Sequence, residues 1–301
     1  MQPIIVRTLF SEIRVWPGDE AAAKSFAFVR AAPVGGGRVG EPMDIAIEPL
    51  GAFYRMVLPD RPDTEGSLEY LVSVFQRFLG ARLEREVGRY PVLHAASVVC
   101  ESIRGLIIGS KGSGKTTLVL TLMMEGFSVE GDEHVMIREQ TVLARPRTLR
   151  VKQTSLPLLL PLSLPLLRPL ADTVAASPSS ESWYGRVIYS VEPCGAPWRI
   201  EEGPAKLLIF IEPNHDGTSI LTPMRREEAF ERLLEMSYFP DGAPGAAVAA
   251  LRMAAIGAKC LKLKLGNLER AVWHLRRAFS DARINVTSAG SLGDVRGEAD
   301  V

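Results

Sequence analysis

The sequence predicts an α/β fold built around a strand–loop–helix unit, and three observations predict it. Residues 109–116 read Gly-Ser-Lys-Gly-Ser-Gly-Lys-Thr, which is the complete pattern G-x-x-x-x-G-K-[ST]. The short apolar run 105–108 before it is typical of a buried strand, and the run 116–125 after it is typical of a helix that ends at Gly126. We therefore expect this loop to bind a nucleoside triphosphate rather than to be a glycine-rich turn that matches by chance.

The expected contacts with the nucleotide follow from the chemistry of such a loop. Glycines let backbone N–H groups turn inward around phosphate oxygens, and the helix N-terminus adds a partial positive charge. We expect Lys115 to reach the β- and γ-phosphates and the Thr116 hydroxyl to ligate Mg²⁺. Lys111 is either one more phosphate contact or a solvated side chain. The residues predicted to bind the nucleotide are Gly109, Ser110, Lys111, Gly112, Ser113, Gly114, Lys115, Thr116 and Thr117.

Two further features flank the loop. Asp132 and Glu133 interrupt the strand-like run 127–137, and His94 lies at the start of the strand that precedes the one beginning at Gly105. Adjacent residues on a strand point to opposite faces, so the chain must bend here if both acids serve one site. One carboxylate could then hold Mg²⁺ while the other accepts the proton of an attacking hydroxyl. Taken singly, a structural histidine and a solvated acidic turn remain alternative interpretations.

The order and spacing of these features resemble the catalytic domain of the bacterial HPr kinase/phosphorylase family. His94 lies 21 residues before Lys115, and the acidic pair begins 17 residues after it. The resemblance implies the mixed-sheet P-loop kinase core shared with phosphoenolpyruvate carboxykinase, with ATP and Mg²⁺ as cofactors. It also implies that Asp132 activates the acceptor hydroxyl, that Glu133 and Thr116 bind Mg²⁺, and that His94 lies near the transferred phosphate. Lys115 completes the catalytic set, and Asp132 is a candidate metal ligand as well.

The chain departs from that family in two respects. Its second acid is Glu133 rather than Asp, and the Arg-Gly-Leu-Gly-Ile-Ile signature of the family is absent after the acidic pair. HPr itself is therefore not the expected substrate. The chain looks more like the diverged HPr-kinase-like proteins found beside ribosomal peptide-modification genes, some of which phosphorylate a serine of a lasso-peptide precursor. The resemblance thus implies an ATP-dependent serine kinase that acts on a peptide or small protein. A small-molecule kinase and a non-catalytic nucleotide switch stay open as alternatives.

Composition is that expected of a cytoplasmic enzyme. The chain has 301 residues, 47% of them hydrophobic, which is ample for a buried core. Lys plus Arg and Asp plus Glu number 35 each, so no overall charge favours nucleic acid or an anionic membrane as a partner. Cys100, Cys194 and Cys260 are widely spaced, so neither a disulfide framework nor a zinc site is expected. The first residues lack the layout of a signal peptide. The resemblance makes a homo-oligomer an expectation.

We expect three regions along the chain. Residues 1–88 are predicted to be β-rich with one helix, residues 89–282 to form the P-loop kinase domain, and residues 283–301 to be a disordered tail. Strands expected at 8–16, 25–30, 43–47 and 52–58 would form a small antiparallel sheet, and an apolar stripe predicts a helix over 67–87. Later elements are expected as strands at 92–99, 105–109 and 205–211 and as helices at 226–238, 244–257 and 268–279, the last capped by Asn267.

Two connecting stretches allow more than one interpretation. Prolines at every fourth position of 156–170 exclude a membrane-spanning helix, so this leucine-rich stretch is either a connector or an apolar docking surface. Residues 176–182 read as a surface loop. Basic side chains that could hold substrate carboxylates, or simply face solvent, are Arg147, Arg150, Lys152, Arg225 and Arg226.

Overall fold

The computed structural model describes residues 1–8, 10–29, 40–88, 90–145, 149–152, 178–183, 186–191, 201–215, 217–239 and 244–291. The leucine- and proline-rich stretch 156–170, Arg147 and Cys194 lie outside these described residues. The fold is a mixed α/β arrangement, as the sequence predicts, with parallel and antiparallel strand pairs in its sheets.

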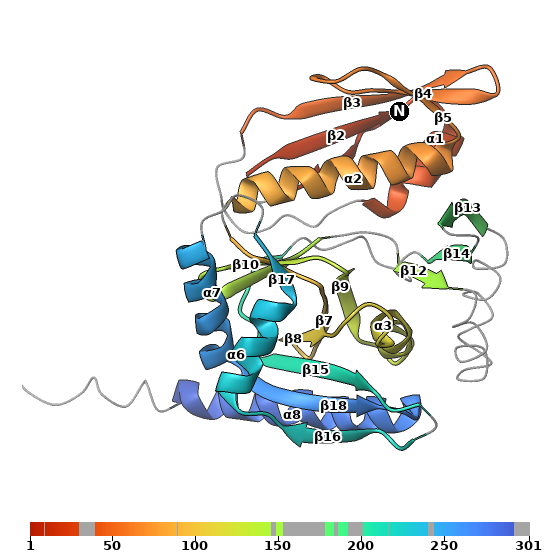
Figure 1. Ribbon diagram of the computed structural model, residues 1–301. Helices are drawn as coiled ribbons and strands as arrows, with labels where there is room; N and C mark the ends of the chain where they lie inside the picture. The colour runs from red at the N-terminus through yellow and green to blue at the C-terminus, as the bar shows by residue number, and fades with distance from the viewer. Residues whose placement is uncertain are drawn as a thin grey trace, which may run out of the picture.

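A six-stranded sheet forms the centre of the molecule, in the order β16-β18-β15-β8-β7-β9 (Figure 1). Its strands are β7 (Ala95–Cys100), β8 (Ile103–Ile108), β9 (Ser128–Asp132), β15 (Leu207–Pro213), β16 (Ile220–Pro223) and β18 (Lys259–Leu265). Strands β8, β15 and β18 are parallel, whereas β7 runs antiparallel to both β8 and β9. Consequently β8 and β9 end at the same edge of the sheet at which β7 begins.

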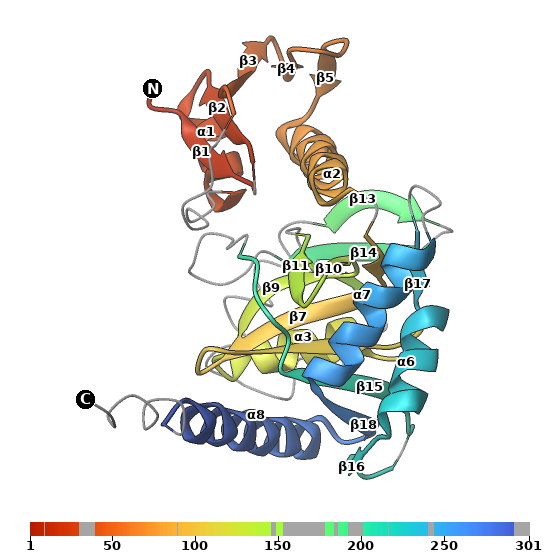
Figure 2. The same cartoon turned by 90° about the vertical axis from the view of Figure 1, so that its left-hand side faces the viewer.

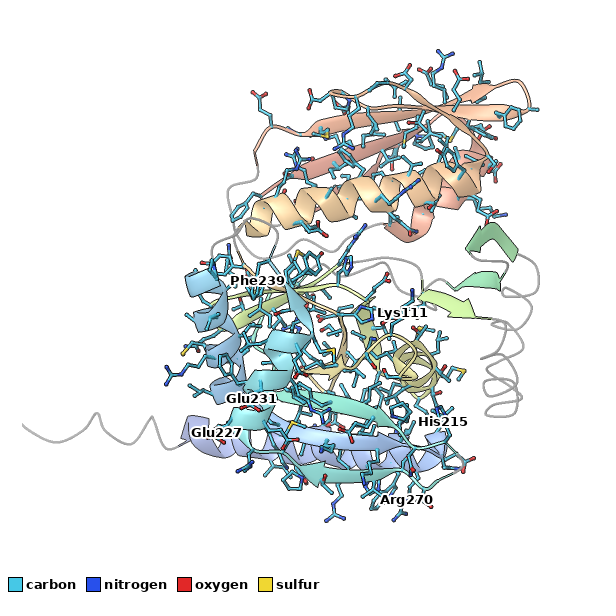
Figure 3. The ribbon with its side chains drawn as sticks, in the orientation of Figure 1. Lys111, His215, Glu227, Glu231, Phe239 and Arg270 are labelled. Atoms are coloured by element: carbon cyan, nitrogen blue, oxygen red, sulfur yellow. The ribbon has the colours of Figure 1, made fainter. Side chains whose placement is uncertain are left out.

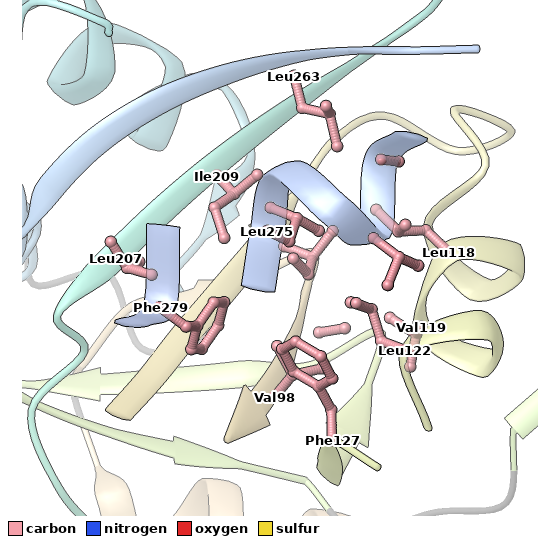
Figure 4. Packing of buried hydrophobic residues seen from close by; sticks show 14 of the residues in the cluster. Val98, Leu118, Val119, Leu122, Phe127, Leu207, Ile209, Leu263, Leu275 and Phe279 are labelled. Carbon is pink, nitrogen blue, oxygen red and sulfur yellow. The ribbon is translucent and has the colours of Figure 1, made fainter. Parts of the chain in front are cut away.

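Helices cover both faces of this sheet. One face packs against α3 (Lys115–Met124) and α8 (Leu268–Ser291), and the other against α6 (Arg226–Glu235) and α7 (Pro244–Gly257). Figure 4 shows the first of these cores, where side chains of α3 and α8 meet those of the sheet. The rings of Phe127 and Phe279 lie edge to face in it, with centroids 5.3 Å apart. Burial on both faces explains why these strands read as continuous apolar runs in the sequence.

Two smaller sheets flank the centre. One is antiparallel in the order β11-β10-β6-β17, and its β10 is the strand that follows the acidic pair in the sequence. The other is antiparallel in the order β12-β14-β13. Their strands are β6 (Val92–Leu93), β10 (Val135–Arg138), β11 (Thr141–Ala144), β12 (Leu149–Lys152), β13 (Pro178–Trp183), β14 (Arg186–Val191) and β17 (Ser237–Tyr238). Strand β12 packs against α3, and its Leu149 belongs to the same core as the buried side chains of α3 and α8.

The N-terminal region is a five-stranded sheet with helices on one face. It consists of β1 (Ile4–Arg7), β2 (Glu12–Pro17), α1 (Glu20–Phe26), the 3₁₀ turn η1 (Ala27–Val29), β3 (Met43–Leu50), β4 (Phe53–Val57), β5 (Thr64–Gly66) and α2 (Leu68–Val87). Helix α2 lies between this sheet and the remainder of the molecule in both views (Figures 1 and 2). Its apolar stripe packs in a core that also contains Val92, Met136 and Leu143, so α2 shares its core with the strands beyond it.

Several predicted elements are confirmed. The Ser67 hydroxyl accepts a hydrogen bond from the Tyr70 backbone N–H and caps α2, and the Asn267 side chain caps α8 through the Arg270 N–H. Helix α7 spans the residues predicted for it. The break that separates β6 from β7 falls at His94, inside the single strand predicted over 92–99.

Two predictions for the N-terminal sheet are wrong. Residues 25–30 were expected to be a strand, but 20–29 are helical, because the Asp19 carboxylate accepts a hydrogen bond from the Ala22 N–H and caps α1. That helix connects β2 to β3, and the two strands consequently pair in parallel. The sheet is therefore mixed rather than antiparallel.

Two predictions nearer the C-terminus are also wrong. The surface loop expected at 176–182 is strand from Pro178 onward, because β13 pairs with β14 and this pairing overrides the turn-forming composition. Residues 283–291, the first part of the tail expected to be disordered, instead continue α8 to Ser291, and residues 292–301 lie outside the described residues. Neither proline nor glycine interrupts 280–289, and Ala282 is still buried, so nothing ends the helix earlier.

Candidate functional site

Strand register brings the predicted site residues to one edge of the central sheet. Ala95 is paired with Ile108, the last residue before the phosphate-binding loop, and Ala96 is paired with Asp132. The Glu133 N–H donates a 2.9 Å hydrogen bond to the Ala95 carbonyl. His94, the loop and the acidic pair therefore meet at the same edge, although 39 residues separate the first from the last.

The loop has the backbone expected of a phosphate-binding loop. Gly112 and Gly114 have φ angles of 89° and 93°, which side-chain-bearing residues rarely adopt. Gly114 is also the N-cap of α3 and provides no side-chain hydrogen bond to the first turn of the helix. The N–H groups of that turn are consequently not capped by a side chain of the N-cap residue, as an anion-binding helix N-terminus requires.

Side chains of the loop divide into exposed and buried groups. Ser110, Lys111 and Gly112 are exposed, and Figure 3 shows Lys111 on the part of the molecule that faces α2. Ser113 and Lys115 are buried, and Lys115 Nζ donates a 2.8 Å hydrogen bond to the Gly109 carbonyl. The exposed position of Lys111 leaves both interpretations of its role open.

Thr116 and Asp132 are joined directly. The Thr116 hydroxyl donates a 2.7 Å hydrogen bond to Asp132 Oδ2, and the Asp132 side chain is buried. Asp132 Oδ1 is also buried but has no hydrogen-bond partner among the described residues. An unsatisfied carboxylate oxygen is costly to bury, so its presence at the mouth of a phosphate-binding loop indicates a function.

These oxygens fit Mg²⁺. The Thr116 proton is directed at Asp132, which leaves the lone pairs of the hydroxyl for a cation. No cluster of three or more His, Cys, Asp or Glu side chains suited to a metal occurs in the part of the chain that the structure describes. Mg²⁺ is usually held by one or two protein oxygens together with nucleotide phosphates and water, and the Thr116 hydroxyl with the neighbouring carboxylate could supply such oxygens.

The chain bends between the two acids, as one shared site requires. Glu133 has a φ of 96°, so the strand ends at Asp132 and the next one begins at Val135. A non-glycine residue with such a φ is strained, and such strain is found mainly where function maintains it.

His94 lies in the electric field of the other site residues. Burial and, to a lesser extent, the positive charge of Lys115 lower its pKa to about 4, although the Asp132 carboxylate acts in the opposite direction. His94 is therefore a neutral imidazole at neutral pH. Its backbone N–H donates to the Met236 carbonyl, which ties this edge of the sheet to β17.

Two supports of the acidic pair were missed by sequence reasoning. Arg104 makes two 2.7 Å hydrogen bonds to the Glu130 carboxylate, which also accepts one from Ser97, and this buried network holds β9 just before Asp132. The Arg145 guanidinium is hydrogen-bonded to the His134 side chain, next to the acidic pair, and to the Gln76 carbonyl of α2. An ion pair between distant positions leaves no local signal in the sequence. Gly80 does provide a detectable signal, because a glycine inside a predicted helix often has a packing reason.

The basic residues considered as substrate contacts have different positions. Arg226 lies close enough to Cys260, the second residue of β18, to affect the pKa of its thiol, so it sits at the amino end of the parallel strands. The loop follows the carboxyl end of β8, which is the other edge of the sheet. Figure 3 shows this separation between Lys111 and Glu227 of α6. Arg150 and Lys152 belong to β12, beside α3.

Comparison with known proteins finds likeness among solved structures. No family model matches the sequence, and no curated protein matches it. Among solved structures, the chain is similar to the Hpr(Ser) kinase/phosphatase from Coxiella burnetii, with 11% sequence identity and a TM-score of 0.35. The likeness covers 69% of this chain and 99% of the other. No helix among the described residues is long and apolar enough to cross a membrane.

Proposed function

We propose that this chain is an ATP-dependent phosphotransferase that transfers the γ-phosphoryl group to a hydroxyl, and that the acceptor is a serine or threonine of a peptide or small protein. One observation carries the phosphotransferase proposal: a complete phosphate-binding loop whose Thr116 is hydrogen-bonded to an acid with a buried, unpartnered oxygen. The peptide acceptor rests on the sequence resemblance alone.

The residues of the site would divide the work as follows. The loop N–H groups and Lys115 bind the phosphates, and Thr116 with Glu133 holds Mg²⁺, which neutralises charge on the β- and γ-phosphates. Asp132 orients the Thr116 hydroxyl through Oδ2 and accepts the acceptor's proton at Oδ1. The neutral His94 donates or accepts a hydrogen bond beside the transferred group without adding a charge. Positioning and electrostatics provide most of the rate enhancement.

The transfer balances with these groups alone. The acceptor oxygen forms a bond to the γ-phosphorus while the bond from that phosphorus to the β–γ bridging oxygen breaks, and ADP leaves with the electron pair. The acceptor's proton passes to Asp132 Oδ1. The products are ADP and a phosphate ester.

The proposal is tested by following the γ-phosphoryl group. The protein is incubated with Mg²⁺ and ATP labelled at the γ-phosphate, together with serine-containing peptides, the same peptides with alanine in place of serine, or small polyols. We expect label on the serine peptides only, and no transfer by Lys115→Ala. Lys24→Ala, which removes an exposed lysine of α1, is the matched control and should transfer normally.

Two outcomes would contradict the proposal. Label on the polyols and not on the peptides would make the chain a small-molecule kinase. Tight ATP binding without transfer to any acceptor would support a nucleotide switch, in which triphosphate binding orders a surface for a partner.

A further inference from the structure

Arg145 contacts the chain on both sides of the acidic pair. Its backbone N–H donates a 2.9 Å hydrogen bond to the His134 carbonyl, just after the pair. Just before the pair, a Cβ placed on Gly131 would lie 2.3 Å from the Arg145 carbonyl oxygen. No side chain fits in that space, so the backbone of Arg145 packs directly against β9. The position of the bend therefore depends on where Arg145 lies.

The side chain of Arg145 lies on α2. Its guanidinium donates to Nδ1 of His134 at 3.0 Å and to the Gln76 carbonyl at 3.4 Å. A Cβ placed on Gly80 would lie 2.0 Å from Arg145 Nε and 2.1 Å from Cζ, so the guanidinium packs against bare helix backbone. Only glycine allows this approach, although glycine is less favourable than alanine inside a helix.

Glu84 and Tyr238 complete the contact. The Glu84 carboxylate lies 3.7 Å from both the Arg145 guanidinium and His134 Nδ1, and it accepts a 3.4 Å hydrogen bond from the Tyr238 hydroxyl. The Tyr238 ring meets the His134 ring edge to face at 5.8 Å. The side chains of Glu84, Arg145, His134 and Tyr238 thus connect α2, the bend and β17. Arg145 has an exposed side-chain fraction of 14%, which is lower than that of Glu84 or His134.

We propose that Arg145 is a positioning residue, which fixes the acidic bend 132–133 by anchoring it to α2 at Gly80. This inference rests on the proposed function, because it assigns the N-terminal region a part in the same phosphoryl transfer. Arg145 does not touch the reacting groups. It acts through Asp132 and Glu133, whose distance from the phosphate-binding loop it sets, and a displacement of about 1 Å at such a site reduces catalysis strongly.

A double-mutant cycle isolates this role. Gly80→Ala adds one methyl group where the guanidinium lies, and Arg145→Ala removes the guanidinium. We expect each single variant to lower kcat about tenfold or more and to raise the Mg²⁺ concentration needed for half-maximal activity, while affinity for ATP without metal stays unchanged. In the Arg145→Ala background, Gly80→Ala should have no further effect, because the new methyl group displaces nothing.

The controls separate positioning from loss of stability. Arg85→Ala removes an exposed arginine of α2, next to Glu84 in the sequence, and should leave kcat and the Mg²⁺ requirement unchanged. Amide hydrogen exchange provides a readout independent of activity: the Glu133 N–H, bonded to Ala95, should exchange faster in Gly80→Ala and at the wild-type rate in Arg85→Ala. This measurement remains informative if a variant loses thermal stability, since exchange elsewhere in the core serves as the reference.

The results that overturn this inference differ from those that overturn the proposed function. Wild-type protein that transfers no phosphoryl group contradicts the proposed function, and hydrogen exchange then still tests the anchoring. Active wild type together with an equally active Gly80→Ala contradicts the positioning role. Effects of the two single variants that add in the double variant would also contradict it, because Gly80 and Arg145 would then act independently.

Discussion

The hydroxyl of Thr116 is hydrogen-bonded at 2.7 Å to Asp132 Oδ2, and the other oxygen of that carboxylate is buried without a hydrogen-bond partner among the described residues. Thr116 is the second residue of α3, which follows the loop, whereas Asp132 ends β9, which is separated from β8 by β7 in the sheet. Their contact joins the nucleotide-binding part of the site to its acidic part. It follows that changes at Asp132 should be felt at the metal and at the acceptor rather than in folding.

The ionisation of His94 gives a pH prediction. Because burial and Lys115 lower its pKa to about 4, the unfolded chain binds a proton between about pH 4 and 6.5 that the folded chain does not. The contribution of His94 to the free energy of unfolding is therefore complete above pH 6.5 and is lost as pH falls towards 4. Denaturant unfolding at pH 7 and pH 5 should show a smaller loss in His94→Gln than in wild type.

The same residue should respond to nucleotide. Phosphates bound beside Lys115 offset the positive charge that lowers the pKa of His94, so the pKa measured by NMR titration of the imidazole should rise when the nucleotide binds. An imidazole that titrates at its ordinary value with and without nucleotide would place His94 outside the site.

The backbone at Glu133 predicts an unusual order of stability. Glycine in place of alanine ordinarily destabilises a folded chain, but alanine at a φ of 96° remains strained and glycine does not. We expect Glu133→Gly to have a higher free energy of unfolding than Glu133→Ala, by about 1 kcal/mol. Denaturant unfolding of the two variants measures the difference. The ordinary order, with alanine the more stable, would show that the bend is not strained.

Helix α8 should stabilise the layer that carries the loop. Phe279 is buried against Phe127, and a Cβ on Gly105 would lie 2.5 Å from its ring, so truncation leaves a cavity beneath β8. Phe279→Ala should lower the free energy of unfolding by about 3–5 kcal/mol. Trp273→Ala removes a larger side chain of the same helix that is 46% exposed, and it should cost less than about 1 kcal/mol. Similar losses in both would argue against the packing seen in Figure 4.

Much of the site could be predicted from sequence because its signals are local. The loop, its helix and the strand before it lie next to one another in the chain. The resemblance to the HPr kinase/phosphorylase family implied that His94 and Asp132 meet at the loop. The bend at Glu133 was required by the alternation of side chains along a strand, and the structure contains it. That Asp132 contacts Thr116 depends on strand register, which the sequence does not state.

The errors arose where a pairing partner or a cap decided the outcome. Residues 25–30 alternate like a strand, yet the signal that decides their structure is Asp19, which caps a helix several residues earlier. Residues 178–182 have the composition of a loop and become a strand by pairing with β14. Arg145 meets Gly80 and Glu84 across more than 60 positions of sequence, and no pattern read along the chain connects them.

The central claim is that Asp132 takes the acceptor's proton beside a bound nucleotide, and Asp132→Asn tests it most directly. Asn is nearly the same shape, so folding and ATP affinity measured by calorimetry with Mg²⁺ should be retained, while it cannot accept the proton. We expect phosphoryl transfer to the acceptor to fall by about 10² to 10⁴-fold. Transfer within a few-fold of wild type would contradict the account, and a matching loss of Mg²⁺-dependent ATP binding would make Asp132 a metal ligand instead of the base.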